Sequence, residues 1–364
     1  MFRGLTVAAM LLVNDPGSWG HIYPPLRHAA WHGWTPTDLI FPFFLFIMGV
    51  TTHLSLTRRR ARGATEGQLR GQVLRRGGVI VLLGLLLSAF PFFPLEWIAQ
   101  VRIPGVLQRI GVVYLVTGFL VLGTSLRTQV SIIAGILAGY WLLLAAVPVP
   151  GVGAPALAPP DATLAAWVDR LLLDGHLWAQ TRTWDPEGPL STLPAIATCL
   201  IGVLAGRWIT QPRPLSERLN GLFAAGVVGL VAGSAWNWVF PINKNLWTSS
   251  YVVFTAGMAC QALATCMWLV EERRARWWAQ PFLVFGVNPI VAFVGAEATA
   301  RLLYSVIRVS YQGETVPLQA AIYRSAFASW LPPEAASLAF ALVFVLLWYA
   351  ILFLLDRRGV HLKV

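Results

Sequence analysis

The sequence predicts an all-α fold, a polytopic membrane bundle of about ten transmembrane helices. The chain has 364 residues, of which 57% are hydrophobic and only 12% are charged, with a mean hydropathy of +0.64. A soluble globular domain carries about 25% charged residues. Lipid admits only helices or closed barrels, and barrel strands would alternate in hydropathy, so the long apolar stretches of this chain predict helices.

Nine apolar stretches have the length of about 20 residues that crossing a bilayer requires. They are Thr35–Thr57, Val73–Phe93, Ile103–Gly123, Val130–Val149, Leu190–Trp208, Leu219–Val239, Ser250–Val270, Phe282–Tyr304 and Ser337–Leu355. A further stretch, Leu5–Val13, is too short to cross alone at about 1.5 Å per residue. We expect it to be a broken half-span or part of a helix that starts upstream. No internal repeat divides the chain, so residues 1–364 are predicted to form a single domain.

The basic residues predict which helix ends face the cytoplasm. The loop after Thr57 is rich in arginine and is cytoplasmic by the positive-inside rule. Because successive spans cross the membrane in alternating directions, 18 of the 27 basic residues fall on the cytoplasmic side. In contrast, 11 of the 16 acidic residues lie in the opposite loops or within spans. The 18 are Arg3, Arg58, Arg59, Arg60, Arg62, Arg70, Arg75, Arg76, Arg127, Arg207, Arg213, Arg218, Arg273, Arg274, Arg276, Arg357, Arg358 and Lys363. The net charge of +11 is therefore a topology signal, and we predict no nucleic-acid partner.

The opposite face carries a polar loop, Asn14–Trp34, that holds three of the six histidines. His28 and His32 are four residues apart, but neither has the neighbouring Glu of a zinc helix, so we predict no metal site. A general base needs an imidazole of near-neutral pKa in a partly dry pocket. Arg27 would favour the neutral form of His28. The alternative is that these are interfacial histidines beside an aromatic belt.

Other polar residues lie where burial in lipid is costly. Gln108 and Arg109 fall in the outer half of a predicted span, and Arg109 has no carboxylate nearby in the sequence. Charged residues within the membrane usually face a cavity and mark a ligand path. Glu297 and Arg301 are four residues apart, so we expect either an ion pair along one helix face or, as the alternative, side chains that face a cavity.

Two short motifs lie at the outer ends of spans. The turn Asn243-Lys244-Asn245 is expected at the outer mouth, as part of the polar site or as a simple interfacial loop. Thr35-Pro36-Thr37-Asp38 has the pattern of a helix N-cap, a proline in the first turn and an acid three residues on. We therefore predict that Asp38 caps a helix rather than taking part in chemistry.

Several long segments resemble the heparan-α-glucosaminide N-acetyltransferase family, and its bacterial members most of all. They are Arg3-Gly4 through Val13-Asn14, LRHAAWHGWTPTDLIFPFFLFIMG (Leu26–Gly49), RIPGVLQRIGVVYLV (Arg102–Val116), DPEGPLSTLPAIAT (Asp185–Thr198), FPINKNLWTSSYV (Phe240–Val252) and FGVNPI (Phe285–Ile290). The matching segments occur in order along the whole chain.

The resemblance implies a transmembrane acetyltransferase that moves acetyl from cytoplasmic acetyl-CoA to the amino group of a glucosamine-type sugar. It implies His28 as the catalytic histidine and Asn14 as a second catalytic residue. The matching segments contain or adjoin polar residues that we expect to bind substrate or cofactor: Asp15, Gln108, Arg109, Asp185, Asn243, Lys244 and Asn288. The expected location is a bacterial inner membrane, with the His28 loop periplasmic. The expected partners are acetyl-CoA, the amino sugar, the lipid bilayer and, as a further candidate, a second copy of the chain in a homodimer.

Two other functions remain open on the sequence. A transporter for an amino sugar or muropeptide would also need polar residues in its spans, although it should show paired broken helices in two halves. An O-acetyltransferase for an envelope polysaccharide would use the same donor on a hydroxyl group.

Overall fold

Nine helices in the described part of the chain, residues 1–362, are long and apolar enough to cross a membrane. The computed structural model describes residues 1–362, except for the side chains of residues 95–97. Lys363, one of the basic residues assigned to the cytoplasmic side, therefore lies outside the described residues. The nine are α2 with the short helix before it (Pro36–Ala61), α3 (Glu66–Ala89), α4 (Val106–Gly123), α5 (Leu126–Ala146), α7 (Pro189–Ile209), α8 (Leu215–Trp236), α9 with a π turn (Ser249–Glu272), α11 with a π turn (Pro289–Val306) and α13 (Pro333–Arg357).

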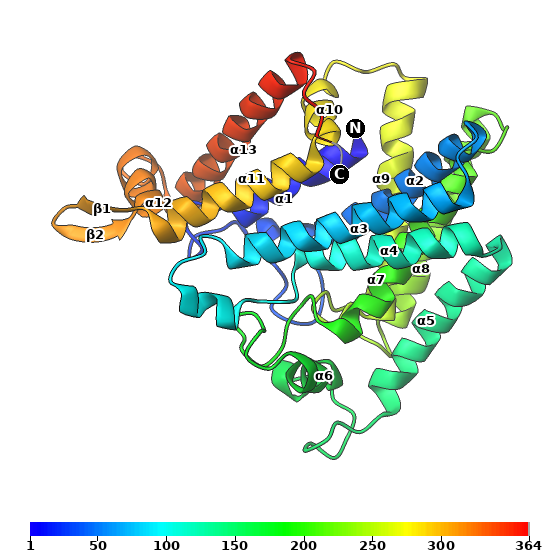
Figure 1. Cartoon of the computed structure of the whole chain (residues 1–364), viewed down its shortest axis with the longest axis horizontal. Helices are drawn as coiled ribbons and strands as arrows, with labels where there is room; N and C mark the ends of the chain where they lie inside the picture. Colours follow the sequence, from blue (N-terminus) through cyan, green and yellow to red (C-terminus); the bar gives the residue numbers. More distant parts are fainter. Residues whose placement is uncertain (363–364) are drawn as a thin grey trace.

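The remaining elements are short. They are α1 (Phe2–Asn14), α6 (Leu164–Leu173), α10 (Gln280–Val287), α12 (Leu318–Ile322) and the hairpin strands β1 (Arg308–Tyr311) and β2 (Glu314–Pro317). Figure 1 shows the hairpin projecting from one end of the bundle, close to α12. The helical membrane bundle predicted from the sequence is confirmed, with nine long helices and a short apolar helix at the start.

Burial separates inner helices from outer ones. The long helices differ in the buried share of an apolar 18-residue segment. This share is 56–67% in α2, α4, α7 and α9, but only 22–28% in α3, α5, α8 and α13. An apolar helix that protein does not cover is suited to lipid contact. The inner helices therefore form the frame around which the site is built.

The predicted helix over Phe282–Tyr304 is wrong as a single element. α10 ends at Val287 and α11 begins at Pro289, with Asn288 between them at φ −118° and ψ 54°. Proline lacks an N–H group and disfavours a helical conformation in the residue before it. α11 therefore leaves α10 in a new direction (Figure 1).

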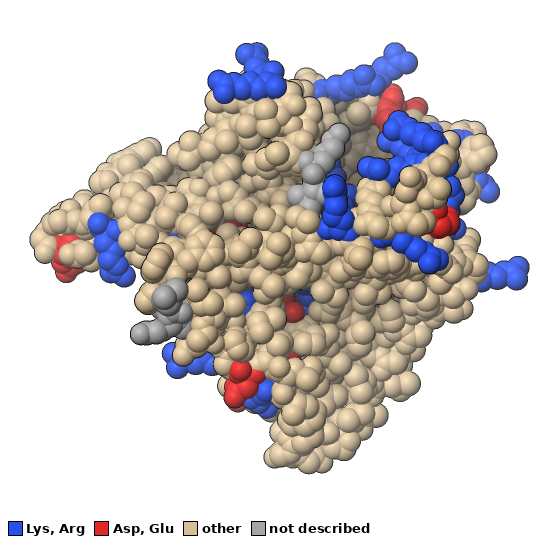
Figure 2. Space-filling model, in the orientation of Figure 1, with Lys and Arg blue, Asp and Glu red and all other residues tan. Residues whose placement is uncertain are grey.

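Basic side chains gather at one end of the bundle. Figure 2 shows them along the upper and right-hand edges, near the ends of α2 and α13 seen in Figure 1. The last turn of α2 contains Arg58, Arg59 and Arg60, and that of α13 contains Arg357. This end is called the arginine end below; its position on the cytoplasmic side stays a prediction.

Two glycines allow α2 and α7 to touch at backbone distance. A Cβ at Gly49 would lie 1.9 Å from the carbonyl oxygen of Cys199, and one at Gly202 would lie 2.0 Å from that of Phe46. Small residues at helix crossings are how membrane helices pack closely without a hydrophobic driving force.

We predict that Gly49→Val destabilises the bundle, because overpacking of a tight interface costs about 1–3 kcal/mol. Thermal unfolding of the detergent-solubilised protein should show a lower midpoint. The matched control is Gly71→Val in α3, where an added Cβ meets nothing within 4 Å. Equal midpoints for the two variants would contradict the close contact between α2 and α7.

Candidate active site

His28 and Asp38 form a hydrogen-bonded pair. Nδ1 of His28 lies 2.6 Å from Oδ1 of Asp38, whose side chain is 1% exposed. A carboxylate only accepts, so the Nδ1–H group donates to it and Nε2 keeps its lone pair. The imidazole is 46% exposed, so its ring can be reached from the cavity. This arrangement suits a general base whose tautomer is set by a buried acid.

The predicted cap at Asp38 is confirmed, but the cap is only part of its role. Oδ2 accepts hydrogen bonds from the N–H groups of Ala29 and Thr35, each at 3.0 Å, and the capping box with Thr35 is complete. The contact with His28 was missed, because a separation of ten residues across an irregular loop has no sequence signature.

The cation beside His28 is Lys244 rather than Arg27. Nζ of Lys244 lies 3.1 and 3.2 Å from the two ring nitrogens of His28 and 3.8 Å from Oδ1 of Asp38. Arg27 donates to the carbonyl oxygen of Ile22 instead. The turn that carries Lys244 is therefore part of the polar site, one of the two alternatives left open by the sequence.

Asn243 holds this turn in shape. Its Oδ1 accepts the N–H of Leu246 at 2.8 Å, and its own N–H donates to the hydroxyl of Thr248 at 3.0 Å. Its side-chain amide also lies 3.3 Å from Nδ1 of His32. Asn243 is completely buried, so it supports the site from behind rather than facing a ligand.

His28 and Lys244 open into a polar chamber of about 500 Å³. We call it the His28 chamber. Its other polar and aromatic walls come from α1, α3, α4, α11 and the loops after α1 and before α4, α7 and α9: Asn14, Trp19, Ser88, Arg102, Gln108, Trp178, Trp184, Glu187, Asn245, Glu297 and Arg301. The structure thus brings four of the predicted site residues, Asn14, His28, Gln108 and Lys244, to one cavity.

Asn14 and the charged pair of α11 occupy one wall of this chamber. Asn14 donates to Glu297 at 3.4 Å. The predicted ion pair between Glu297 and Arg301 is wrong, because Arg301 donates to the carbonyl oxygens of Ser88 and Phe90, at 3.2 and 3.1 Å. These carbonyls belong to the C-terminal end of α3, where helix carbonyl groups lack intrahelical partners.

Arg102 organises the opposite wall. It forms two hydrogen bonds with the carboxylate of Asp185 and one with Glu187. Burial raises the pKa of Asp185, and Arg102 opposes that rise. Burial would also raise the pKa of Glu187, but the cations Arg102, Arg109 and Lys244 hold it below its ordinary value. Glu187 therefore faces the chamber as a carboxylate, while Asp185 anchors Arg102 behind the wall.

Five predicted binding residues do not line the chamber: the buried Asn243 described above, and Arg109, Asp185, Asp15 and Asn288. Arg109 is 2% exposed and donates to the Gly188 carbonyl and the Ser191 hydroxyl. Asp185 is buried behind Arg102, and Asp15 is buried just after α1. Asn288 lies toward the arginine end, where its amide exchanges two hydrogen bonds with the backbone of Val360 and Leu362, both at 3.0 Å.

A second cavity, of about 870 Å³, lies at the arginine end. Its lining includes Arg3, Arg58, Arg59, Arg62 and Arg76, with Gln68 and Gln72 beside them. Figure 2 shows a hollow bordered by basic side chains on the upper right of the molecule. We call it the arginine cavity.

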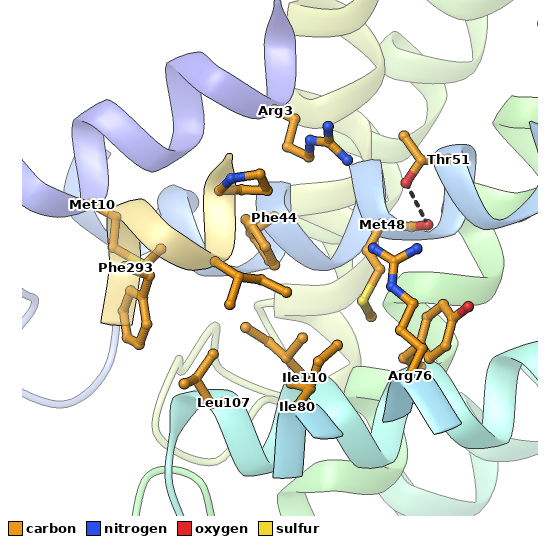
Figure 3. A pocket seen from close by; sticks show the side chains of 13 residues that line it. Arg3, Met10, Phe44, Met48, Thr51, Arg76, Ile80, Leu107, Ile110 and Phe293 are labelled. Carbon is orange, nitrogen blue, oxygen red and sulfur yellow. Dashed lines mark hydrogen bonds between the residues drawn. The ribbon is translucent and has the colours of Figure 1, made fainter. Parts of the chain in front are cut away.

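A narrow apolar neck lies between the two cavities. It encloses about 40 Å³ and is lined mainly by apolar side chains such as Phe44, Met48 and Ile110. It shares Arg3, Thr51, Arg76, Pro289 and Ile290 with the arginine cavity. It shares Met10, Leu107 and Phe293 with the His28 chamber. Figure 3 shows Arg3, Thr51 and Arg76 toward one side of the neck, and Met10, Leu107 and Phe293 toward the other. No local pattern in the sequence predicts the neck, because its residues resemble ordinary core residues.

The fold and the site define a class: a polytopic helical membrane protein with a half-exposed histidine bound to a buried carboxylate in one cavity, a basic second cavity, and an apolar neck that shares lining residues with both. Residues 1–232 match the family described as heparan-alpha-glucosaminide N-acetyltransferase, catalytic. The chain belongs to this family, as its sequence motifs indicated.

Two curated relatives carry the same description. The heparan-alpha-glucosaminide N-acetyltransferases of Homo sapiens and Mus musculus are each 32% identical over 347 residues, which is 81% of this chain and 52% of theirs. The chain therefore spans about half the length of the curated relatives it matches.

Asp169 of α6 supports the Arg102 wall from outside the predicted spans. Its Oδ2 accepts the N–H of Asp185 at 2.9 Å. Its Oδ1 is buried and has no hydrogen-bond partner in the described part of the chain. Burial raises the pKa of Asp169 to about 7.

We predict that this carboxyl makes stability depend on pH. The folded protein keeps the proton up to about pH 7, whereas the unfolded chain releases it near pH 4. Wild-type stability should therefore fall as pH rises from about 4 to 7, because the folded state binds more protons in that window. Asp169→Asn should reduce this slope in thermal unfolding followed from pH 4.5 to 8. Parallel pH profiles for the two proteins would contradict the prediction.

Proposed function

We propose that this protein transfers an acetyl group from acetyl-CoA, bound at the arginine cavity, to the amino group of a glucosamine-type sugar in the His28 chamber. The observation that carries the proposal is the neck, which shares lining residues with both cavities. The family description supports the acetyl donor and the amino-sugar acceptor. The positive-inside rule favours a cytoplasmic arginine end and hence a periplasmic His28 chamber, which suits a bacterial inner membrane.

The two ends match the two halves of the donor. Coenzyme A carries several phosphate groups, which arginine binds through paired, charge-assisted hydrogen bonds. Its pantetheine arm is thin and carries the acetyl group at the tip. An apolar neck of about 40 Å³ suits this arm better than a hydrated polyanion. The nucleotide can therefore stay at the arginine cavity while the thioester reaches His28.

The chamber offers groups that suit an amino sugar. Trp178 and Trp184 contribute to its walls, and flat aromatic faces pack well against sugar rings. Glu187 and Glu297 supply negative charge for an ammonium group.

The chemistry follows from the pair formed by His28 and Asp38. The sugar amine attacks the carbonyl carbon of the thioester, and Nε2 of His28 takes a proton from the attacking nitrogen. Asp38 stabilises the resulting imidazolium through the 2.6 Å contact at Nδ1. The tetrahedral intermediate then expels the CoA thiolate, which receives the proton from His28. The products are the N-acetylated sugar and free CoA.

We predict that His28→Ala lowers acetyl transfer to glucosamine at least about 100-fold, the range expected for loss of a general base. Asp38→Asn should also lower kcat strongly while keeping a capping side chain at the start of α2. Purified protein supplied with radiolabelled acetyl-CoA measures both effects. His21→Ala is the matched control, because this exposed histidine of the same loop lies near Glu334 instead. Full turnover by His28→Ala would remove His28 from the mechanism.

We predict that filling the neck separates donor binding from transfer. Ile110→Trp places a large ring where α4 borders the neck, so acetyl transfer should fall to background. Binding of adenosine 3′,5′-bisphosphate, the nucleotide end of CoA, should persist. Val112→Trp is the control, since Val112 of the same helix is 40% exposed on its outer side. Undiminished transfer by a folded Ile110→Trp protein would show that acetyl takes another route.

Substituting hydroxyl acceptors for glucosamine in the same assay tests O-acetylation. The proposal expects product only from the free amine.

A further inference from the structure

Lys244 is an unusual choice of cation in this chain. Of the 27 basic residues, only Lys244 and Lys363 are lysines, and the others are arginines. Lys244 sits at the His28 chamber with only 19% of its side chain exposed. Lysine presents a compact charge with three hydrogen-bond donors, whereas arginine presents a planar fork suited to carboxylates and phosphates. The contacts of Lys244 suggest a use for that difference.

We propose that the Lys244 ammonium is a catalytic group that donates a hydrogen bond to the acetyl carbonyl oxygen as it becomes an oxyanion. This inference rests on the function proposed above. It adds the residue that polarises the acetyl carbonyl group while His28 takes the proton.

Distance places Lys244 where the oxyanion forms. Its Nζ lies 3.2 Å from Nε2 of His28, the atom that takes the proton from the attacking amine. That amine must therefore lie within a hydrogen bond of Nε2, and the carbonyl oxygen is bonded to the carbon it attacks. A donor within a hydrogen bond of Nε2 can reach that oxygen with a small shift of a flexible side chain.

Lys244 is not needed as the partner of Asp38. Nζ is 3.8 Å from Oδ1 of Asp38, beyond hydrogen-bond length. The carboxylate already accepts from His28, from two backbone N–H groups and from the Thr35 hydroxyl. Groups other than the ammonium therefore meet the hydrogen-bonding capacity of Asp38, and Lys244 contributes only its nearby positive charge.

Two other donors that line the chamber are already engaged. Asn14 donates to Glu297, and Arg102 is bound by Asp185 and Glu187. The turn under Lys244 is held by Asn243, so the ammonium is positioned before the substrate arrives. Preorganised donors of this kind are the largest single contribution to many acyl-transfer reactions.

Burial strengthens this donor. It lowers the pKa of Lys244 below the ordinary value, although Asp38 and Glu187 oppose the shift. An ammonium of lowered pKa donates more strongly to a developing oxyanion.

The step balances without another reactant. The amine nitrogen bonds to the carbonyl carbon, its proton moves to Nε2 of His28, and the carbonyl π electrons move onto oxygen. Lys244 donates a hydrogen bond to that oxygen and keeps its proton. When the oxygen reforms the double bond, the carbon–sulfur bond breaks and the thiolate takes the proton from His28.

Steady-state kinetics on Lys244→Met and Lys244→Arg test the role, with radiolabelled acetyl-CoA and glucosamine as substrates. Removing an oxyanion donor costs about 100- to 1000-fold in kcat, so Lys244→Met should lose that much. Lys244→Arg keeps a donor and should recover part of the rate. KM for both substrates should change little, because the contact forms only in the transition state. Arg308→Met, which removes an exposed cation of the outer hairpin, is the control.

The outcomes separate this inference from the function on which it rests. A folded Lys244→Met protein with kcat within threefold of wild type overturns the inference. So does a change confined to KM, which would indicate a binding role. Equal losses in Lys244→Met and Lys244→Arg would indicate a structural requirement for lysine and also count against it. If wild type and Arg308→Met both transfer no acetyl to glucosamine, the proposed function itself fails and this inference falls with it.

Discussion

The site depends on one buried carboxylate, that of Asp38. A carboxylate removed from water is strongly destabilising unless donors surround it. Here the first turn of α2, the backbone at Ala29 and the imidazole of His28 all supply donors. The hydroxyl of Tyr251 in α9 also donates to the Asp38 carbonyl oxygen. The hydrogen bonds that Asp38 needs in its buried position therefore have three effects. They stabilise the start of α2, hold His28 in one tautomer and connect the outer loop to an inner helix.

The break between α10 and α11 gives the bundle its connection between the two ends. Pro289 and Ile290, the first residues of α11, line both the arginine cavity and the neck. A continuous helix through Asn288 would follow a different path beyond that point. The apolar walls of the neck also have a physical advantage, because an apolar constriction resists passage of water and ions. Thus a helix break that is costly in lipid is tolerated where it lines a passage inside the protein.

The sequence predicted elements whose signals are local, and it missed partners that are distant along the chain. The spans and the Thr35–Asp38 cap follow from hydropathy and short spacing. The contact of Arg102 with Asp185 joins residues 83 positions apart, and nothing in the local pattern selects that pair. Arg301 shows the opposite failure, since its i, i+4 spacing to Glu297 predicted an ion pair. Arg301 instead donates to carbonyl groups at the end of α3, which only the fold brings within its reach.

Charge distribution decides which molecule each end can accept. The residues that line the arginine cavity, within the described part of the chain, include five arginines and no carboxylate. A polyanion is attracted there, and a protonated amine is repelled. At the His28 chamber, Glu187, Glu297 and the nearby Asp38 offset Arg102, Lys244 and Arg301. Because these charges balance, the chamber does not repel an amine. It also has no excess positive charge that would attract a polyanion through the neck. In the proposed function, this difference in charge directs a polyanionic donor to the arginine cavity and an amine to the His28 chamber.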